Sequence, residues 1–162
     1  STFNPVMDYT NNEEFIQDVE ICALHLNSLT EDYKRIPVNL AIAQAIHESN
    51  WGKSRFAREA NNLYGIRTFD SSKDQLKPLD NPNVTWGLRI FETKCESVSY
   101  YMWLLNYSHH YSKFREERLM QYAGDVVNLD KLALTLAIYS EDVYYTQKII
   151  RTLKKLESYD RD

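Results

Sequence analysis

The sequence predicts an α+β fold dominated by helices, with one small β-hairpin element. Apolar residues recur at helical spacing before residue 60 and again after residue 93, while turn-forming residues crowd the stretch between them. The chain has 162 residues, of which 43% are hydrophobic, and only four are glycine and four proline. This length and composition suit a single domain over residues 1–162 with one core.

The first part of the chain is expected to fold into three helices. After a polar lead-in over residues 1–10, Asn11 and the acids behind it are suited to begin a helix. Pro37 opens the next helix, because proline is tolerated in the first turn, and Gly52 is suited to end it. A short helix over residues 54–60 follows. The inward stripe of the first helix consists of Phe15, Val19, Cys22, Leu26 and Leu29.

The middle of the chain changes character. Residues 63–68 and 85–91 are the best candidates for strands, and residues 69–84 form an irregular excursion at the hairpin tip, rich in Asp, Ser, Asn and Pro. Connections of this length are usually functional or mobile. We therefore expect the excursion to be mobile without a ligand and to form one wall of a cleft.

The last part is expected to be helical again. Thr93 and Glu96 fit a capping box for a helix that continues through Leu105. A helix over residues 111–122 and another over 129–139 follow, separated by a break at residues 124–128. Asp142 is placed to cap the final helix, and the inward face of that helix consists of Tyr145, Ile149, Leu153 and Leu156.

The composition excludes several classes of function. The formal net charge is −4 and no long basic run exists, so we expect no nucleic-acid partner. No apolar stretch approaches the 18 or more residues of a membrane span. No signal peptide is visible, and because the chain opens with Ser1 rather than Met, an export signal could have been removed.

The sequence gives no sign of a metal or cofactor site. His47-Glu48 begins like a zinc-protease motif, but Trp51 stands where the second histidine would be required. The two cysteines, Cys22 and Cys95, lie on apolar helical faces without nearby histidines. They are either packed thiols or, in an oxidising compartment, one disulfide between the first helix and the helix after the hairpin.

Glu48 is the most informative residue of the chain. At about 100° per residue it projects about 20° from Ala41, at the edge of the apolar stripe of its helix and in the last turn. Burial and the negative end of the helix dipole both disfavour a carboxylate there, so the pKa of Glu48 should rise. A carboxylic acid that stays neutral near pH 7 suits a general acid. The alternative is that Glu48 pairs with Arg55 or Arg58 and stiffens the turn.

Three stretches carry a resemblance to a known family. Residues 43–66 read Ala-Gln-Ala-Ile-His-Glu-Ser-Asn-Trp-Gly-Lys-Ser-Arg-Phe-Ala-Arg-Glu-Ala-Asn-Asn-Leu-Tyr-Gly-Ile. Residues 89–92, read Arg-Ile-Phe-Glu, and the segment Tyr139-Ser-Glu-Asp142 with Tyr145 follow in the same order. From about residue 37 to 156 the chain resembles the glucosaminidases of glycoside hydrolase family 73, most closely the Bax-like branch, which implies a lysozyme-like fold.

The resemblance implies an enzyme that cleaves the glycan strand of bacterial peptidoglycan. The bond is the β-1,4 link on the reducing side of N-acetylglucosamine, with Glu48 as general acid, Tyr139 as its assistant, and no metal or cofactor. Tyr139 could equally be a core tyrosine. Tyr145, Trp86 and Glu141 are the expected substrate-binding residues, although Tyr145 and Trp86 could also be packing residues. We further expect a monomer that acts in the periplasm, outside the cell or in the cell envelope.

The second carboxylate that glycoside hydrolysis commonly uses is not evident. The candidates are Asp70, Asp74 and Asp80 in the excursion, and Glu141 and Asp142 in the closing motif. The acetamido group of the substrate could act as nucleophile instead. Two further functions therefore stay open: a lytic transglycosylase on the same strand, and a non-catalytic module that binds cell-wall glycan.

Overall fold

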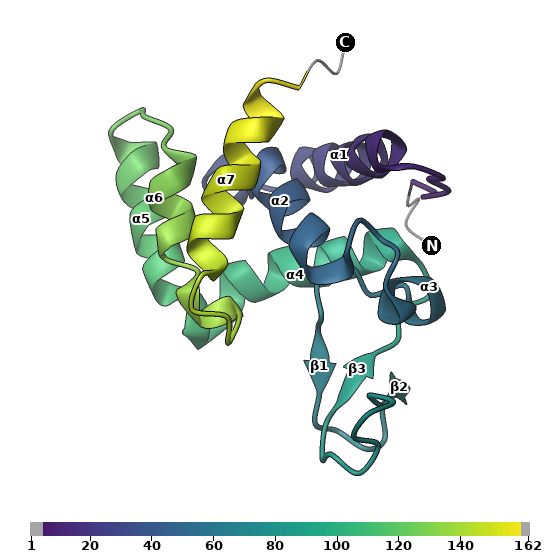
Figure 1. The fold of residues 1–162 in the computed structure, drawn as a ribbon. Helices are drawn as coiled ribbons and strands as arrows, with labels where there is room; N and C mark the ends of the chain where they lie inside the picture. Colours follow the sequence, from purple (N-terminus) through teal and green to yellow (C-terminus); the bar gives the residue numbers. More distant parts are fainter. Residues whose placement is uncertain (1–4, 160–162) are drawn as a thin grey trace.

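The computed structural model of the chain describes residues 5–159, and it is dominated by helices (Figure 1). Three short 3-10 helices, η1 (Asp32–Lys34), η2 (His109–Tyr111) and η3 (Ala137–Tyr139), connect the longer elements. The α-helices are α1 (Asn12–Ser28), α2 (Val38–Ser49), α3 (Arg55–Ala60), α4 (Lys94–Tyr107), α5 (Ser112–Ala123), α6 (Leu129–Leu134) and α7 (Tyr145–Glu157). The strands are β1 (Arg67–Thr68), β2 (Gln75–Leu76) and β3 (Gly87–Arg89).

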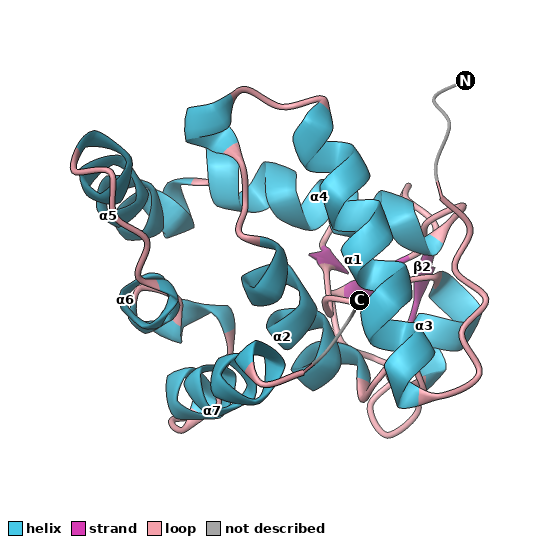
Figure 2. Cartoon of the chain, turned by 90° about the horizontal axis from the view of Figure 1, so that it is seen from above, coloured by secondary structure: helices cyan, strands magenta, loops and turns pink. Residues whose placement is uncertain are grey.

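Helix α2 lies in the middle of the other helices (Figures 1 and 2). Every residue from Leu40 to Ile46 is buried, so the helix is enclosed on more than the single apolar face that its periodicity predicts. Its closest neighbours are α1 and α7. Ser49 ends the helix, and Asn50, Trp51 and Gly52 follow with φ values of 49°, 60° and 73°, a left-handed turn that begins two residues after Glu48.

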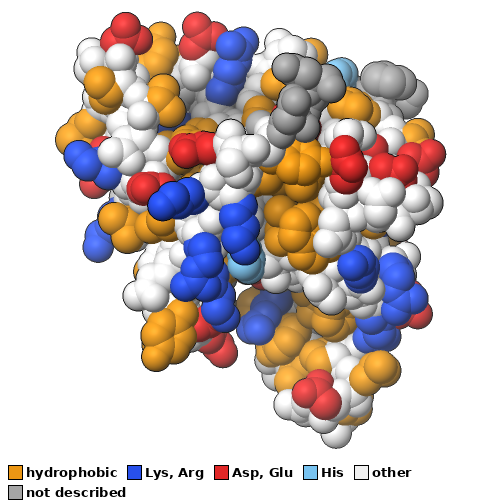
Figure 3. Space-filling view, turned by 45° about the horizontal axis from the view of Figure 1, so that its top comes forward, with side chains coloured by type: hydrophobic (Ala, Val, Ile, Leu, Met, Phe, Trp, Pro, Cys, Tyr) orange, Lys and Arg blue, Asp and Glu red, His pale blue; other side chains and the backbone are white. Residues whose placement is uncertain are grey.

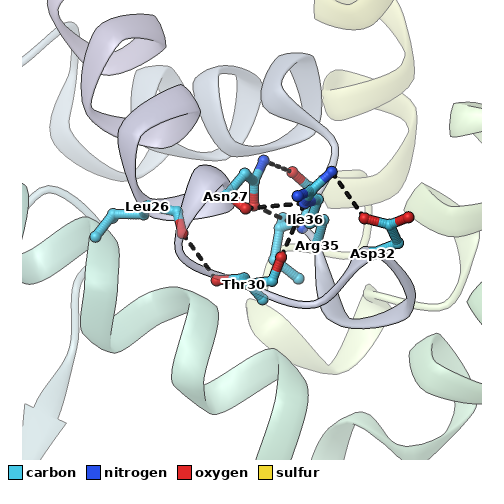
Figure 4. Close-up of polar contacts among 6 residues, drawn as sticks. All are labelled: Leu26, Asn27, Thr30, Asp32, Arg35 and Ile36. Atoms are coloured by element: carbon cyan, nitrogen blue, oxygen red, sulfur yellow. Dashed lines mark hydrogen bonds and ion pairs between the residues drawn. The ribbon is translucent and has the colours of Figure 1, made fainter.

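The connection from α1 to α2 is fixed by side-chain hydrogen bonds to the backbone (Figure 4). Asn27 donates from Nδ2 to the carbonyl of Ile36 over 2.8 Å and accepts from the Ile36 N–H over 3.2 Å. Arg35 donates to the carbonyls of Asn27 and Thr30 and forms an ion pair with Asp32 at 3.0 Å. These contacts bring the chain back to α2, where Pro37 serves as the residue before the first turn.

The lead-in is more firmly packed than its composition suggests. Residues 1–4 lie outside the described residues, but Tyr9 packs edge-on against Phe15, with ring centroids 4.9 Å apart. Its hydroxyl donates to the carbonyl of Gly52 over 2.9 Å. A Cβ on Gly52 would overlap the Tyr9 ring, so this glycine serves both the left-handed turn and the close approach.

The β element is a three-stranded antiparallel sheet with the order β1-β3-β2, rather than a plain hairpin. Leu88 in the central strand pairs with Arg67 of β1 and with Leu76 of β2. The excursion at residues 69–84 is thus not irregular throughout, because Gln75 and Leu76 within it form an edge strand of the sheet. The expectation was wrong there because two residues of β2 are too few to show a period in the sequence.

Two helical predictions need correction in the C-terminal part. The helix expected over residues 129–139 is divided into α6 and η3. At Thr135 the backbone changes to hydrogen bonds spanning three residues, and the Thr135 hydroxyl donates to the carbonyl of Leu132 over 2.6 Å. A threonine that bonds the backbone in this way competes with a continuous helix. Asp142 does not cap α7 as expected, because Tyr144 is the N-cap residue; the Asp142 side chain accepts from the Tyr144 N–H over 2.9 Å, before the helix begins.

A disulfide joins Cys22 of α1 to Cys95 of α4, which decides between the two readings of the cysteines. Both residues are fully buried, and their Cα atoms lie 5.8 Å apart. The bond closes a loop across a sequence separation of 73 residues, for which chain entropy gives about 4 kcal/mol of stabilisation. It fixes the first helix against the helix that borders the cleft described below.

One face of the molecule carries an apolar hollow among α1, α2 and α7. Figure 3 shows hydrophobic side chains exposed at the centre of this face, with Lys and Arg side chains gathered beside them. The hollow measures about 620 Å³, and its lining includes Ile16, Ile46 and Leu156. None of the described helices is long and apolar enough to cross a membrane.

Candidate active site

A cleft of about 500 Å³ lies where the helices meet β1. Its walls come from segments far apart in the sequence: the end of α2, the turn into β1 together with Arg67, α4, η2, and the segment from η3 toward α7. Aromatic side chains dominate the helical wall, and two acids and one arginine supply charge. The lining residues are Glu48, Tyr64, Gly65, Ile66, Arg67, Tyr100, Leu104, Tyr111, Ile138, Tyr139, Ser140 and Glu141.

Glu48 lies partly buried at the back of this cleft, as the periodicity of α2 predicts. Neither alternative partner reaches it, because Arg55 pairs with Glu59 at 2.7 Å and Arg58 donates to the carbonyl of Lys53. Gly65 faces the carboxyl directly: a Cβ there would lie 3.1 Å from Glu48 Oε2. The φ of Gly65 is 65°, so a glycine is favoured by both its backbone and the space beside the acid.

The surroundings of Glu48 raise its pKa from 4.5 to about 7. Burial is the main cause, because it disfavours the charged carboxylate. A hydrogen bond from Tyr145 and the positive charge of Arg67 act in the opposite direction and lower the pKa. A substantial fraction of Glu48 is therefore neutral at pH 7 and able to donate a proton.

Tyr139 lines the cleft beside Glu48, but its hydroxyl already has a partner. The hydroxyl donates to the carbonyl of Tyr64 over 2.9 Å. The ring stacks on Tyr145 with centroids 6.0 Å apart and meets Tyr111 at 5.9 Å. Burial and the nearby Glu48 raise the pKa of Tyr139 well above its ordinary value, so this phenol stays neutral. Tyr139 therefore fits both interpretations, because it packs against the core and also lines the cleft.

Tyr145 lies behind Glu48 rather than on the cleft wall. Only 4% of it is exposed, so its ring offers no surface to a sugar. Its hydroxyl bonds to Glu48 and accepts from Gln44 Nε2 over 3.0 Å. The hydroxyl of Tyr101 in turn donates to Gln44 Oε1. The expected substrate-binding residue is therefore placed as a hydrogen-bond partner of the acid.

Trp86 lies directly before β3. The guanidinium of Arg67 lies over its ring, 3.8 Å from the centroid, in a cation–π contact. Arg67 lines the cleft and Trp86 supports it from outside, so Trp86 does not line the cleft in this structure. A sugar platform at Trp86 stays a prediction.

The other acids separate into two groups. Glu141 is exposed and lines the cleft, as expected of a substrate-binding residue. Asp142 forms an ion pair with Lys148 at 2.6 Å. None of residues 69–84 lines the cleft, so the excursion does not form its wall here, and Asp70, Asp74 and Asp80 are all exposed. β1 supplies that wall instead.

Sequence reasoning missed three parts of this site. Arg67 and Tyr111 carry no local signal, because only the tertiary fold brings β1 and η2 to Glu48. Gln44 did carry one: it is a polar residue amid the apolar run of α2, four residues before Glu48, and it is fully buried. Among residues 5–159, no group of His, Cys, Asp and Glu could hold a metal ion.

The fold and the site define the class of protein, which is a glycoside hydrolase domain of lysozyme-like fold. A partly buried acid lies on a central helix and opens to an aromatic cleft, and a small antiparallel sheet borders this cleft. The family model Glucosaminidase, described as mannosyl-glycoprotein endo-beta-N-acetylglucosaminidase, matches residues 24–158. The chain therefore belongs to the glucosaminidase family. The resemblance to glycoside hydrolase family 73 and the α-dominant fold are confirmed.

Two curated relatives and one solved structure show the extent of the similarity. Protein bax of Escherichia coli (strain K12) is 35% identical over 92 residues, 57% of this chain and 32% of that protein. Exo-glucosaminidase LytG of Bacillus subtilis (strain 168) is 28% identical over 144 residues, 84% of this chain and 50% of that protein. The chain thus spans a half or less of these relatives.

The fold is also found in the catalytic domain of the autolysin Auto from Listeria monocytogenes. The two structures superpose with a TM-score of 0.65 over 94% of this chain and 90% of that chain, at 21% identity. At this identity the likeness concerns the fold, and the roles of single residues rest on the geometry above.

Proposed function

We propose that this domain hydrolyses the glycan strand of peptidoglycan as an endo-β-N-acetylglucosaminidase, at the β-1,4 link on the reducing side of N-acetylglucosamine. The observation that carries the proposal is Glu48: a carboxylic acid with a pKa of about 7 at the back of a cleft large enough for sugar rings. Membership of the glucosaminidase family and the similarity to LytG support the choice of bond.

Proton donation by Glu48 starts the reaction. Its neutral carboxyl gives a proton to the glycosidic oxygen as the C1–O bond breaks, and the sugar ring passes through a transition state with oxocarbenium character. Water then adds to C1, and Glu48 or a second base takes up the proton that water releases. The hydrogen bond from Tyr145 and the charge of Arg67 stabilise the carboxylate that Glu48 becomes.

One charged side chain of the cleft, Arg67, suits an anionic glycan. Arg67 is exposed in the cleft, and its guanidinium is held in place by Trp86 at 3.8 Å. Guanidinium groups bind carboxylates with two parallel hydrogen bonds. Peptidoglycan carries such carboxylates on its peptide substituents, and on the lactyl group of those muramic acid residues that carry no peptide. Arg67 therefore favours this substrate over a neutral polymer of N-acetylglucosamine.

Two groups can complete the reaction after Glu48. Glu141 is the other carboxyl among the described cleft-lining residues and can act as base for water. Attack by the substrate's own acetamido oxygen needs no second carboxylate. Direct attack by water inverts the anomeric centre, while acetamido participation retains it, so the anomer first formed identifies the group.

Digestion of purified peptidoglycan in ¹⁸O-labelled water tests the proposed function. We expect muropeptides that end in N-acetylglucosamine with one ¹⁸O atom at the new reducing end, seen by mass spectrometry. Anhydro products would show a lytic transglycosylase instead, and tight binding without cleavage would show a glycan-binding module. Either result would overturn the proposal.

The disulfide supports a location outside the reducing cytoplasm. Buried disulfides persist mainly in exported proteins and in the bacterial periplasm. The bond between Cys22 and Cys95, together with a cell-wall substrate, leads us to propose action in the periplasm, outside the cell or in the cell envelope.

A further inference from the structure

We propose that Gln44 is a positioning residue for Glu48: with Tyr101 it holds the Tyr145 hydroxyl in the orientation that donates its proton to the Glu48 carboxyl. The catalytic consequence rests on the proposed function, but the hydrogen-bond geometry does not. Neither Gln44 nor Tyr101 touches the cleft, so both act through Tyr145.

The three residues form a continuous chain through the core. The Tyr101 hydroxyl of α4 donates to Gln44 Oε1 of α2, and Gln44 Nε2 donates to the Tyr145 oxygen of α7 over 3.0 Å. The Tyr145 hydroxyl in turn interacts with the Glu48 carboxyl and lowers the pKa of Glu48. Gln44 and Tyr101 are fully buried, and water therefore does not compete for these groups.

In this series of hydrogen bonds, every residue donates toward the next one, from Tyr101 through Gln44 to Tyr145. A glutamine amide has one oxygen that accepts and one nitrogen that donates, and a tyrosine hydroxyl has a single proton. Because Tyr101 donates to the amide oxygen, the amide nitrogen faces Tyr145. Because the Tyr145 oxygen accepts from that nitrogen, the Tyr145 proton remains available for Glu48, whose pKa the interaction with Tyr145 lowers. The chain thus makes Tyr145 a donor that favours the carboxylate over the acid.

Gln44 is a polar residue in an apolar setting. The surrounding residues of α2 from Leu40 to Ile46 are apolar and buried, and an apolar side chain of similar size would leave the buried hydroxyls of Tyr101 and Tyr145 without this partner. Burying an amide is unfavourable unless every polar atom finds a partner. Gln44 meets that condition through Tyr101 and Tyr145, one helical turn before Glu48.

The hydrogen-bonded residues Tyr101, Gln44 and Tyr145 form a relay to Glu48. Several other charged or titratable groups also face Glu48, and the relay acts alongside them. Arg67 of β1 lowers the pKa of Glu48, as the Tyr145 bond does, whereas burial raises it. The phenols of the remaining elements stay neutral, because burial and the charge of Glu48 raise their pKa values. These phenols are Tyr101 of α4, Tyr111 of η2 and Tyr139 of η3.

Direct titration of Glu48 tests the relay without any activity assay. Protein labelled with ¹³C at the glutamate carboxyls is titrated by NMR, and the Glu48 signal is assigned by its loss in Glu48→Gln. A hydrogen bond to the charged form of a carboxyl favours that form, so loss of the oriented donor should raise the pKa of Glu48 by about one unit in Gln44→Met. Tyr101→Phe should raise it less, because the amide stays but loses its fixed orientation.

The matched control is Tyr9→Phe, which removes a hydroxyl bonded to the Gly52 carbonyl outside the cleft and should leave the pKa of Glu48 unchanged. If Gln44→Met does not fold, Tyr101→Phe retains the test. A folded Gln44→Met or Tyr101→Phe protein with the parent pKa at Glu48 would overturn the relay. In activity assays of these variants, the pH at which kcat/KM falls should move to a higher value by the same amount. If the parent protein shows no activity at all, this counts against the proposed function and not against the relay.

Discussion

Glu48→Gln should lower the rate of glycan cleavage about 10²- to 10⁴-fold, the usual contribution of a general acid. The change keeps the size of the side chain and an oxygen that can accept from Tyr145, but it removes the proton that the glycosidic oxygen needs. The loss should appear in kcat, while KM stays near the parent value. Release of reducing ends from purified peptidoglycan measures both.

Glu141→Gln is the matched control, since it changes the other carboxyl of the cleft, an exposed one. A smaller loss there than in Glu48→Gln is expected, because a base for water can be replaced by the substrate's acetamido group. If Glu48→Gln keeps more than half of the parent activity, Glu48 is not the proton donor.

The same Glu48→Gln variant should be more stable than the parent at pH 8, by about 2–3 kcal/mol. The fold raises the pKa of Glu48 from 4.5 to about 7, so the folded state binds a proton more tightly than the unfolded state does. Stability that comes from this group is complete below pH 4.5 and is lost as the pH rises through 7. Each pKa unit corresponds to 1.36 kcal/mol, and partial exposure reduces the total.

Urea unfolding of the parent and Glu48→Gln at pH 4 and pH 8 measures this difference. The two proteins should have nearly equal free energies of unfolding at pH 4 and separate at pH 8, whereas Glu141→Gln should follow the parent at both. A Glu48→Gln protein that is less stable than the parent at pH 8 would show that the carboxylate stabilises the fold, for instance through Arg67.

The helix that carries the acid could be predicted from the sequence because its signal is local. The apolar spacing of α2 places Glu48 at the edge of a buried stripe, and the structure finds it partly buried in a cleft. The raised pKa follows from that position alone. The same holds for the inward stripe of α7, in which Tyr145, Ile149 and Leu153 are all buried.

The partners of Glu48 could not be predicted in the same way, because they come from distant elements. Gln44 meets Tyr101 and Tyr145 across separations of 57 and 101 residues, and no local period contains such a contact. Arg67 reaches the cleft only once β1 has paired with β3. The helix break at Thr135 depends on one hydroxyl bonding the backbone, which residue spacing does not reveal.

The pH dependence of kcat/KM on purified peptidoglycan tests the central claim most directly: Glu48 acts as a neutral acid with a pKa of about 7. Because the free enzyme must hold the proton, kcat/KM should be high below pH 7 and fall tenfold for each pH unit above it. The half-maximal point should lie near pH 7. A profile that stays flat to pH 9, or one that already falls near pH 4.5, would contradict this account of Glu48.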